Sequence, residues 1–144
     1  MKELNVQREL IEAVIGADGA AHKLSNRFLT GVADLLIKLP RYPVCLLEVK
    51  IDEIGATTTS IGLTPTMPQI MFLRKYHAAG VPTGVMSCLV QGKQFGTAIV
   101  DITRFERKVR VLCAAHRWCQ MGPADRRALM LAELTQFLRK RGNK

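Results

Sequence analysis

Two apolar runs that follow each other closely constrain the fold of this chain more than any other feature of its sequence. The runs cover Val32 to Leu39 and Val44 to Ile51, and a Pro-Arg-Tyr-Pro segment typical of a turn separates them. We predict a hairpin-like pair of neighbouring strands. Both strands carry charge where a core strand should be apolar: Asp34 lies near the start of the first, and Glu48 and Lys50 near the end of the second. Such charges are costly to bury unless they are paired, bound to a metal or used in chemistry.

The charged residues Asp34, Glu48 and Lys50 can meet in space. Side chains alternate between the two faces of a strand, so Glu48 and Lys50 project from one face. If Asp34 lies at the same level of the adjacent strand, two carboxylates and an ammonium converge. Carboxylates that lie a few ångströms apart repel each other unless a cation separates them, and such oxygen ligands suit Mg²⁺. Spacing alone leaves open a simpler alternative, an exposed ion pair between Glu48 and Lys50 on an edge strand.

Periodicity and turn residues predict a mixed α/β order for the rest of the chain. The expected elements are a helix over 3–15, a short strand within 20–28, the strand pair, a helix that ends near Gly80, strands over 82–90, 95–101 and 108–113, and a basic terminal helix within 122–144. The sequence contains no internal repeat or linker, and 144 residues are enough for one domain with its own core. We therefore expect a single domain.

The segment between Asp52 and Leu63 is rich in Thr and Gly and has no periodicity, so we expect a mobile loop there. Thr64 is expected to cap the helix that follows, with Pro65 in its first turn.

The first helix combines an apolar face with polar residues at two kinds of position. Gln7 lies at the centre of the apolar face and Glu3 lies one turn before it, so both should face inward. Glu9 and Glu12 are expected to face solvent.

Composition favours a polyanion as the partner. Twenty-one Lys and Arg residues against twelve Asp and Glu give a net charge of +9. No apolar run approaches the roughly 20 residues that cross a bilayer, and the first ten residues lack the apolar core of a signal peptide. We expect a cytoplasmic protein that does not enter membranes.

The four cysteines do not have the spacing of a disulfide framework, and we expect reduced, mostly buried thiols. Cys113, His116 and Cys119 are spaced three apart, which is compatible with zinc. Because they leave the usual four-ligand shell incomplete, the end of a core strand is the favoured interpretation.

Three motifs in order resemble a known group of nucleases. They are "HKLSNRFLTGVADL", "LLEVK" and "LTPTMPQ", within His22 to Gly80. This segment resembles the small phage-encoded VRR-NUC nucleases of the PD-(D/E)XK superfamily, which are related to archaeal Holliday-junction resolvases. The Pro of the superfamily motif is Ala33 here, which should be harmless because that residue shapes the bend and carries no ligand.

The resemblance implies an α/β fold with a restriction-endonuclease-like core. The core would be a central mixed β-sheet flanked by helices in the order α-β-β-β-α-β, with a C-terminal helical addition. One nuclease domain would span 1–144, with the core over about 3–91 and additional strands and a helix over about 92–144.

The resemblance also assigns roles within the site. Asp34 and Glu48 would bind Mg²⁺, which Mn²⁺ can replace, together with the main-chain carbonyl of Val49. Lys50 would orient or activate the attacking water. The remaining assignments are Glu3 as the first-helix acid, Gln69 as the helical glutamine, and His22, Lys23, Ser25 and Arg27 as DNA-binding residues.

The activity implied is Mg²⁺-dependent hydrolysis of DNA in phage-type replication, recombination or repair, and resolvase-like relatives suggest a homodimer. Two alternatives stay open: a non-catalytic nucleic-acid-binding module and an RNA-processing nuclease.

Overall fold

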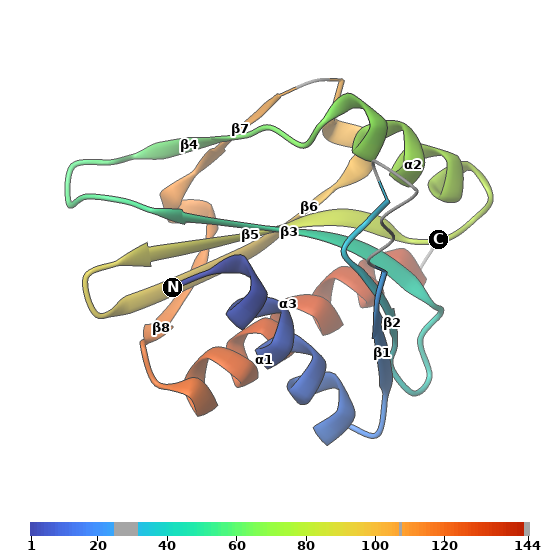
Figure 1. Ribbon diagram of the computed structural model, residues 1–144, viewed down its shortest axis with the longest axis horizontal. Helices are drawn as coiled ribbons and strands as arrows, with labels where there is room; N and C mark the ends of the chain where they lie inside the picture. Colours follow the sequence, from blue (N-terminus) through green and yellow to red (C-terminus); the bar gives the residue numbers. More distant parts are fainter. Residues whose placement is uncertain (25–31, 107, 143–144) are drawn as a thin grey trace.

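Eight strands and three α-helices, with two short 3-10 helices, form the part of the chain that the structure describes. The structure is a computed structural model, and it describes residues 1–24, 32–106 and 108–142 (Figure 1). In chain order the elements are α1 (Glu3–Gly16), β1 (Ala20–Lys23), β2 (Leu35–Lys38), β3 (Cys45–Glu53), β4 (Ser60–Leu63), α2 (Met67–Ala78), β5 (Thr83–Gln91), β6 (Gln94–Asp101), η1 (Ile102–Arg104), β7 (Val109–Leu112), η2 (Cys113–Ala115), β8 (Arg117–Gln120) and α3 (Pro123–Gly142).

The main sheet has six strands in the order β1-β2-β3-β5-β6-β8. β3 and β5 are parallel and are connected through β4 and α2, whereas the other neighbours are antiparallel. The hairpin-like pair predicted from the sequence is present as β2 and β3, with Leu35 opposite Leu47.

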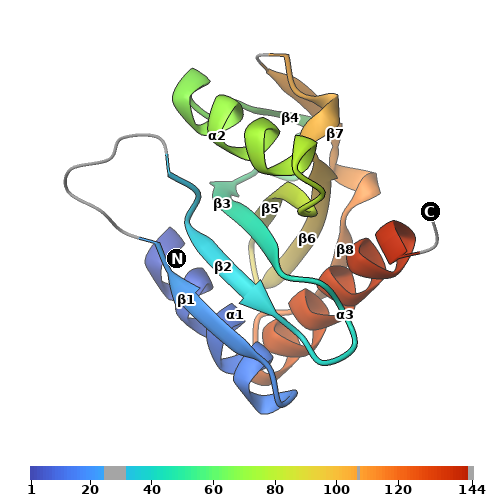
Figure 2. The ribbon, with the colours of Figure 1, turned by 90° about the vertical axis from the view of Figure 1, so that its right-hand side faces the viewer.

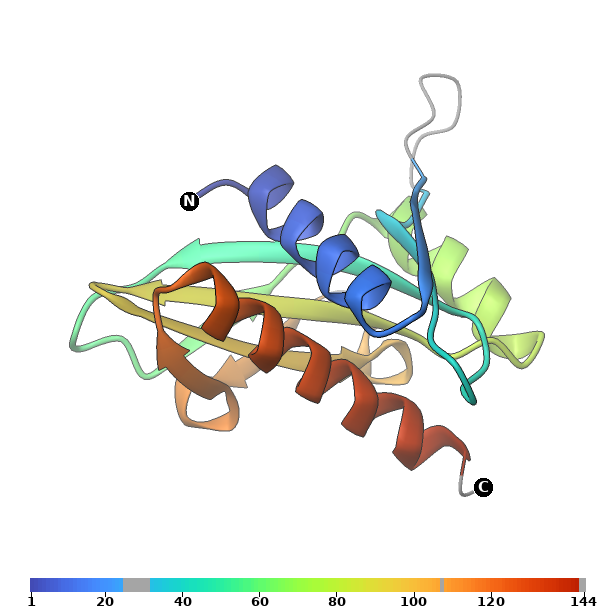
Figure 3. The same cartoon turned by 90° about the horizontal axis from the view of Figure 1, so that it is seen from below.

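Each face of the sheet packs against a different layer. α1 and α3 lie side by side across one face, where Leu35, Leu47 and Val49 are fully buried (Figure 3). The other face is covered by α2 and by the two-stranded sheet that β4 forms with β7 (Figure 1). Alternation along β3 therefore directs Leu46 and Glu48 toward the α2 layer, and it directs Leu47 and Val49 toward α1.

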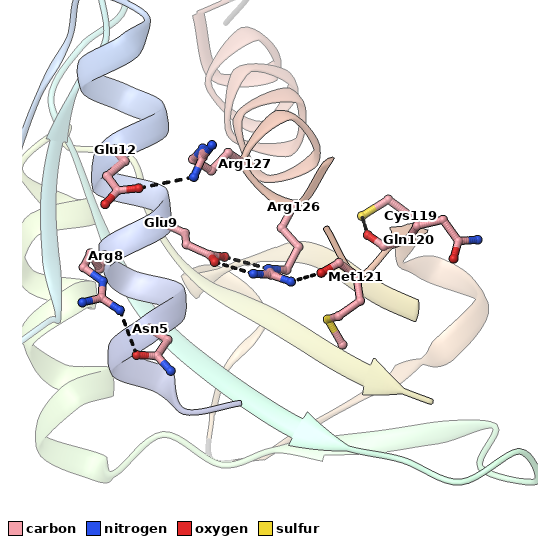
Figure 4. Close-up of polar contacts among 9 residues, drawn as sticks. All are labelled: Asn5, Arg8, Glu9, Glu12, Cys119, Gln120, Met121, Arg126 and Arg127. Carbon is pink, nitrogen blue, oxygen red and sulfur yellow. Dashed lines mark hydrogen bonds and ion pairs between the residues drawn. The ribbon is translucent and has the colours of Figure 1, made fainter. Parts of the chain in front are cut away.

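An ion pair joins α1 to α3 and corrects the expectation that Glu9 faces solvent. The Glu9 carboxylate accepts hydrogen bonds from Nε and Nη2 of Arg126, at 2.8 and 2.5 Å, and both side chains are largely buried (Figure 4). Glu12 pairs more loosely with Arg127 at 3.4 Å and stays half exposed. The partner of Glu9 lies more than a hundred residues away in the chain, so periodicity within α1 carried no sign of it.

The expectation of a loop between Asp52 and Leu63 is wrong at both ends. β3 continues to Glu53, and Ser60–Leu63 form strand β4, which pairs with β7. Ile61 and Leu63 are buried beneath this ribbon. The segment is ordered by a strand that occurs some 45 residues later, which local composition could not indicate.

The start of α2 also differs from its prediction. The N-cap is Thr66 rather than Thr64, and the proline in the first turn is Pro68 rather than Pro65. Two Thr-Pro-like signals compete in this segment, and the one that closes a capping box with Gln69 determines where the helix begins.

The C-terminal cysteines and His116 belong to the protein interior. His116 Nε2 lies 2.8 Å from the Ser87 hydroxyl, and Nδ1 lies 3.1 Å from the Leu112 carbonyl, so both ring nitrogens are engaged. All four cysteines are free thiols. Within the described residues, no helix is long and apolar enough to cross a membrane.

Candidate active site

The pairing of β2 with β3 brings Asp34 and Glu48 together. Because Leu35 lies opposite Leu47, the residue before Leu35 lies beside the residue after Leu47. Asp34 Oδ2 accepts a hydrogen bond of 2.8 Å from the Val49 main-chain N–H, which holds the carboxylate against β3 just beyond the start of β2. In an extended strand the N–H and C=O of one residue point to the same side, so the Val49 carbonyl faces this same edge.

Glu48 is a buried carboxyl with one free oxygen. The residue is 2% exposed, and its Oε1 accepts from Gln69 Nε2 at 3.0 Å and lies 3.6 Å from Lys50 Nζ. Its Oε2 is buried and has no hydrogen-bond partner among the described residues. Burial, followed by the neighbouring Asp34 carboxyl, raises the pKa of Glu48 to about 8, and the Lys50 ammonium only partly opposes this.

Gln69 connects the first turn of α2 to the site. Its Oε1 accepts from the Thr66 main-chain N–H at 2.9 Å, and its own N–H bonds the Thr66 hydroxyl at 3.3 Å. Its Nε2 is thereby directed at Glu48. The capping role that was the alternative for Gln69 and the contact with Glu48 are therefore both present, and each fixes the orientation of the amide.

A small cleft of about 120 Å³ adjoins the carboxylates. Its lining residues are Glu3, Lys50, Ile51, Asp52, Gly62, Leu63 and Thr64. Lys50 forms part of the floor with about a quarter of its side chain exposed. Glu3 enters from the first turn of α1, and its negative charge adds to the upward shift of the Glu48 pKa. The inward orientation predicted for Glu3 thus places it at the cleft.

The donor set suits a hard divalent cation. Two carboxylates repel each other across a site with a buried, unpartnered oxygen, and a cation would relieve both the repulsion and the missing contact. Among the described residues, no group of three or more His, Cys, Asp or Glu side chains is arranged to hold an ion. Asp34 and Glu48 therefore form a two-carboxylate site, and the Val49 carbonyl is the additional oxygen on that edge.

The residues predicted to bind DNA do not all share one place. His22 pairs with Leu36 and so shares a face with Asp34, whereas Lys23 pairs with Leu35 and faces α1. Both are exposed on the edge strand β1 (Figure 2). Ser25 and Arg27 lie outside the residues that the structure describes.

One basic residue near the cleft escaped the sequence analysis. Lys108 extends across β4, and a Cβ added at Gly62 would lie 2.1 Å from its Cε and 2.9 Å from its Nζ. Because Gly62 lines the cleft, the Lys108 ammonium lies beside the cleft rim. Only the pairing of β4 with β7 makes this contact, and no local motif marks Lys108.

Comparisons with known proteins address the fold. No protein-family model matches the chain, and no curated protein sequence matches it. Among solved structures, the chain is similar to Hjc of Archaeoglobus fulgidus, a Holliday junction resolvase from an archaeal hyperthermophile. The TM-score is 0.55 at 15% identity, and the match covers 81% of this chain and 88% of the resolvase chain. The chain therefore has the restriction-endonuclease-like fold that the sequence resemblance predicted.

Proposed function

We propose that this protein is a divalent-metal-dependent nuclease that hydrolyses phosphodiester bonds in structured DNA. The observation that carries the proposal is the buried, unpartnered Oε2 of Glu48 beside the Asp34 carboxylate. A purely structural pair would be expected to satisfy both oxygens, because a buried acceptor without a donor costs about 1–3 kcal/mol. The fold shared with a Holliday junction resolvase and the net charge of +9 support DNA as the substrate.

Each site residue has a role that follows from its position. Asp34 and Glu48, with the Val49 carbonyl, would hold the ion, and Gln69 keeps Glu48 in place by its hydrogen bond. When bound, Mg²⁺ or Mn²⁺ supplies Lewis-acid stabilisation of negative charge on the phosphate. Lys50 keeps its ammonium at the floor of the cleft, where it orients water and offsets charge that develops in the transition state.

The finer parts of the proposal come from the sequence resemblance. They are Mg²⁺ as the ion used, membership of the VRR-NUC group, a role in phage-type replication, recombination or repair, and action as a homodimer. Structure selectivity is proposed from the shared fold with the resolvase.

A cleavage assay tests the proposal. Labelled linear, flap and four-way DNAs, and an RNA of the same sequence, are incubated with the protein in Mg²⁺, Mn²⁺ or EDTA. We expect cleavage of DNA with either ion and none in EDTA. Cleavage that survives full chelation contradicts the metal site, preferential cleavage of RNA favours an RNA-processing enzyme, and tight binding without cleavage favours a binding module.

Carboxylate variants assign the activity to the site. Asp34→Asn and Glu48→Gln should each abolish cleavage and weaken Mn²⁺ binding measured by calorimetry. Asp18→Asn is the matched control, because Asp18 lies in the turn after α1 with a positive φ of 64° that Asn tolerates. Equal activity in all three variants would place the chemistry elsewhere.

A further inference from the structure

A second pocket lies on the flank of α1, apart from the cleft that holds Lys50. Its volume is about 280 Å³, close to the lower end of the range for small-molecule sites, roughly 300–1,000 Å³. Its lining residues are Leu4, Gln7, Arg8 and Ile11 of α1 and Lys23 at the end of β1. The pocket therefore combines aliphatic walls with one amide and two cations. Figure 4 shows Arg8 on the side of α1 that points away from α3.

The amide of Gln7 is the unusual feature of this pocket. Gln7 is only 6% exposed, and its Oε1 has no hydrogen-bond partner among the described residues. An acceptor that is buried without a donor destabilises the protein, because it loses its bonds to water and gains none in return. A ligand that brings an N–H group into the pocket would restore the missing bond.

We propose that this pocket binds an unpaired nucleobase of the DNA substrate, an inference that rests on the proposed function and extends it. A base has flat apolar faces that suit Leu4 and Ile11. Its Watson–Crick edge carries the N–H donors that Gln7 Oε1 lacks, and in a paired duplex those donors are occupied. Arg8 and Lys23 flank the pocket with positive charge suited to the adjoining phosphates.

The position of the pocket relates it to the cleft. Glu3 lines the cleft and Leu4, the next residue of α1, lines the pocket. Gln7 follows Glu3 by about one helical turn, roughly 5.4 Å along the axis. A strand whose phosphate lies at Lys50 can therefore place a nearby base at Gln7. The pocket would select DNA that has an unpaired base close to the cleavage point.

Binding without turnover tests this inference. Affinity is measured by anisotropy in Ca²⁺ and again in EDTA, for a duplex with one unpaired base and for its fully paired counterpart. The wild-type protein should prefer the unpaired base by about tenfold, the size of one stacked and hydrogen-bonded group. Gln7→Met should lose this preference and melt at the same or a higher temperature, because the variant removes the unsatisfied acceptor.

Two further variants keep the test decisive. Leu4→Trp fills the pocket from a side chain that is 58% exposed, so it should spare the fold and lose the preference. Ile15→Ala changes an equally exposed residue of the same helix outside the pocket and should change nothing. A preference that persists in Gln7→Met and Leu4→Trp overturns the inference, as does a clearly lower melting temperature of Gln7→Met, which would mean that the amide has a structural partner.

The outcome is separable from the proposed function. Absence of metal-dependent cleavage by the wild-type protein would contradict the nuclease and leave the binding preference standing. Cleavage with no preference for the unpaired base would leave the nuclease standing and contradict the pocket.

Discussion

At the scale of single residues, the state of Glu48 depends on what lies beside it. Its carboxyl is buried against Asp34, so in the metal-free protein a proton on Glu48 performs part of the task that a cation would perform. Proton and metal therefore compete for the same site. This competition makes stability, metal binding and pH interdependent.

The first prediction concerns that pH dependence. Glu48 has a pKa of about 8 in the folded protein against 4.5 for an ordinary Glu, so between these values the folded state holds a proton that the unfolded chain releases. The melting temperature in EDTA should accordingly fall as pH rises from about 5 to 8. Mn²⁺ binds the ionised carboxylate, so its stabilisation should grow over the same range.

Glu48→Gln is the control for this measurement. It should flatten the dependence in EDTA and remove the stabilisation by Mn²⁺. If thermal scans of the wild type and of Glu48→Gln change in parallel with pH, the protonation of Glu48 is not the cause.

A second prediction separates rate from stability at Lys50. The only ion pair that the structure gives Lys50 among the described residues is the 3.6 Å contact with Glu48, so Lys50→Ala should leave the melting temperature nearly unchanged. Cleavage in single-turnover assays should fall on the order of a hundredfold, or about 2.7 kcal/mol of transition-state stabilisation, with DNA binding in Ca²⁺ nearly the same. Lys93→Ala, in the turn between β5 and β6, is the matched control. Normal cleavage with early melting would make Lys50 a structural residue.

At the scale of elements, the N-terminus of α2 serves the helix and the site together. Gln69 closes the capping box with Thr66 and also donates to Glu48. The third prediction uses Gln69→Glu, which can still accept from the Thr66 N–H but cannot donate to Glu48 when ionised.

We expect Gln69→Glu to retain helix content by circular dichroism and to lose cleavage activity by tenfold or more. Thr66→Ala is the reverse case: it should cost about 1 kcal/mol of unfolding free energy by loss of the cap, with a smaller effect on rate. Equal activity of wild type and Gln69→Glu would show that the bond to Glu48 is dispensable.

The ribbon of β4 and β7 gives the fourth prediction. Lys108 can lie across β4 only because Gly62 has no side chain. Gly62→Ala should displace the lysine and weaken DNA binding in Ca²⁺ by about the same factor as Lys108→Ala, a few fold for one phosphate contact. The double variant should weaken binding no further than either single variant, since both remove one interaction. Additive losses would mean that Gly62 acts by another route.

At the scale of the whole molecule, the C-terminal helix and the first helix form one layer. The ion pair between Glu9 and Arg126 crosses that layer, and Arg126 is 8% exposed. The fifth prediction is that Arg126→Met lowers the free energy of unfolding by about 2 kcal/mol, between the values for exposed and for buried pairs. Urea denaturation checks this.

The double variant Glu9→Gln with Arg126→Met should recover part of that loss, because it leaves no unpaired buried carboxylate. Arg127→Met, on the same helix and paired more loosely with Glu12, is the control and should cost far less. Similar losses in both arginine variants would contradict a special role for the buried pair.

The sequence by itself determined the features whose causes are local. The apolar runs around Asp34 and Glu48 specify β2 and β3, and strand alternation places Glu48 and Lys50 on the face away from α1. The register of a short turn then puts Asp34 beside Glu48. Each of these inferences uses contacts between residues fewer than twenty apart.

The tertiary structure alone decided the features that depend on distant partners. β4 is a strand because β7 pairs with it, Lys108 reaches the cleft rim for the same reason, and Glu9 is buried because Arg126 approaches from α3. Composition and periodicity describe what a segment can do on its own face, whereas these positions acquire their state from hydrogen bonds and charges supplied by another part of the chain. A single sequence does not encode those pairings in any local pattern, so only the folded arrangement reveals them.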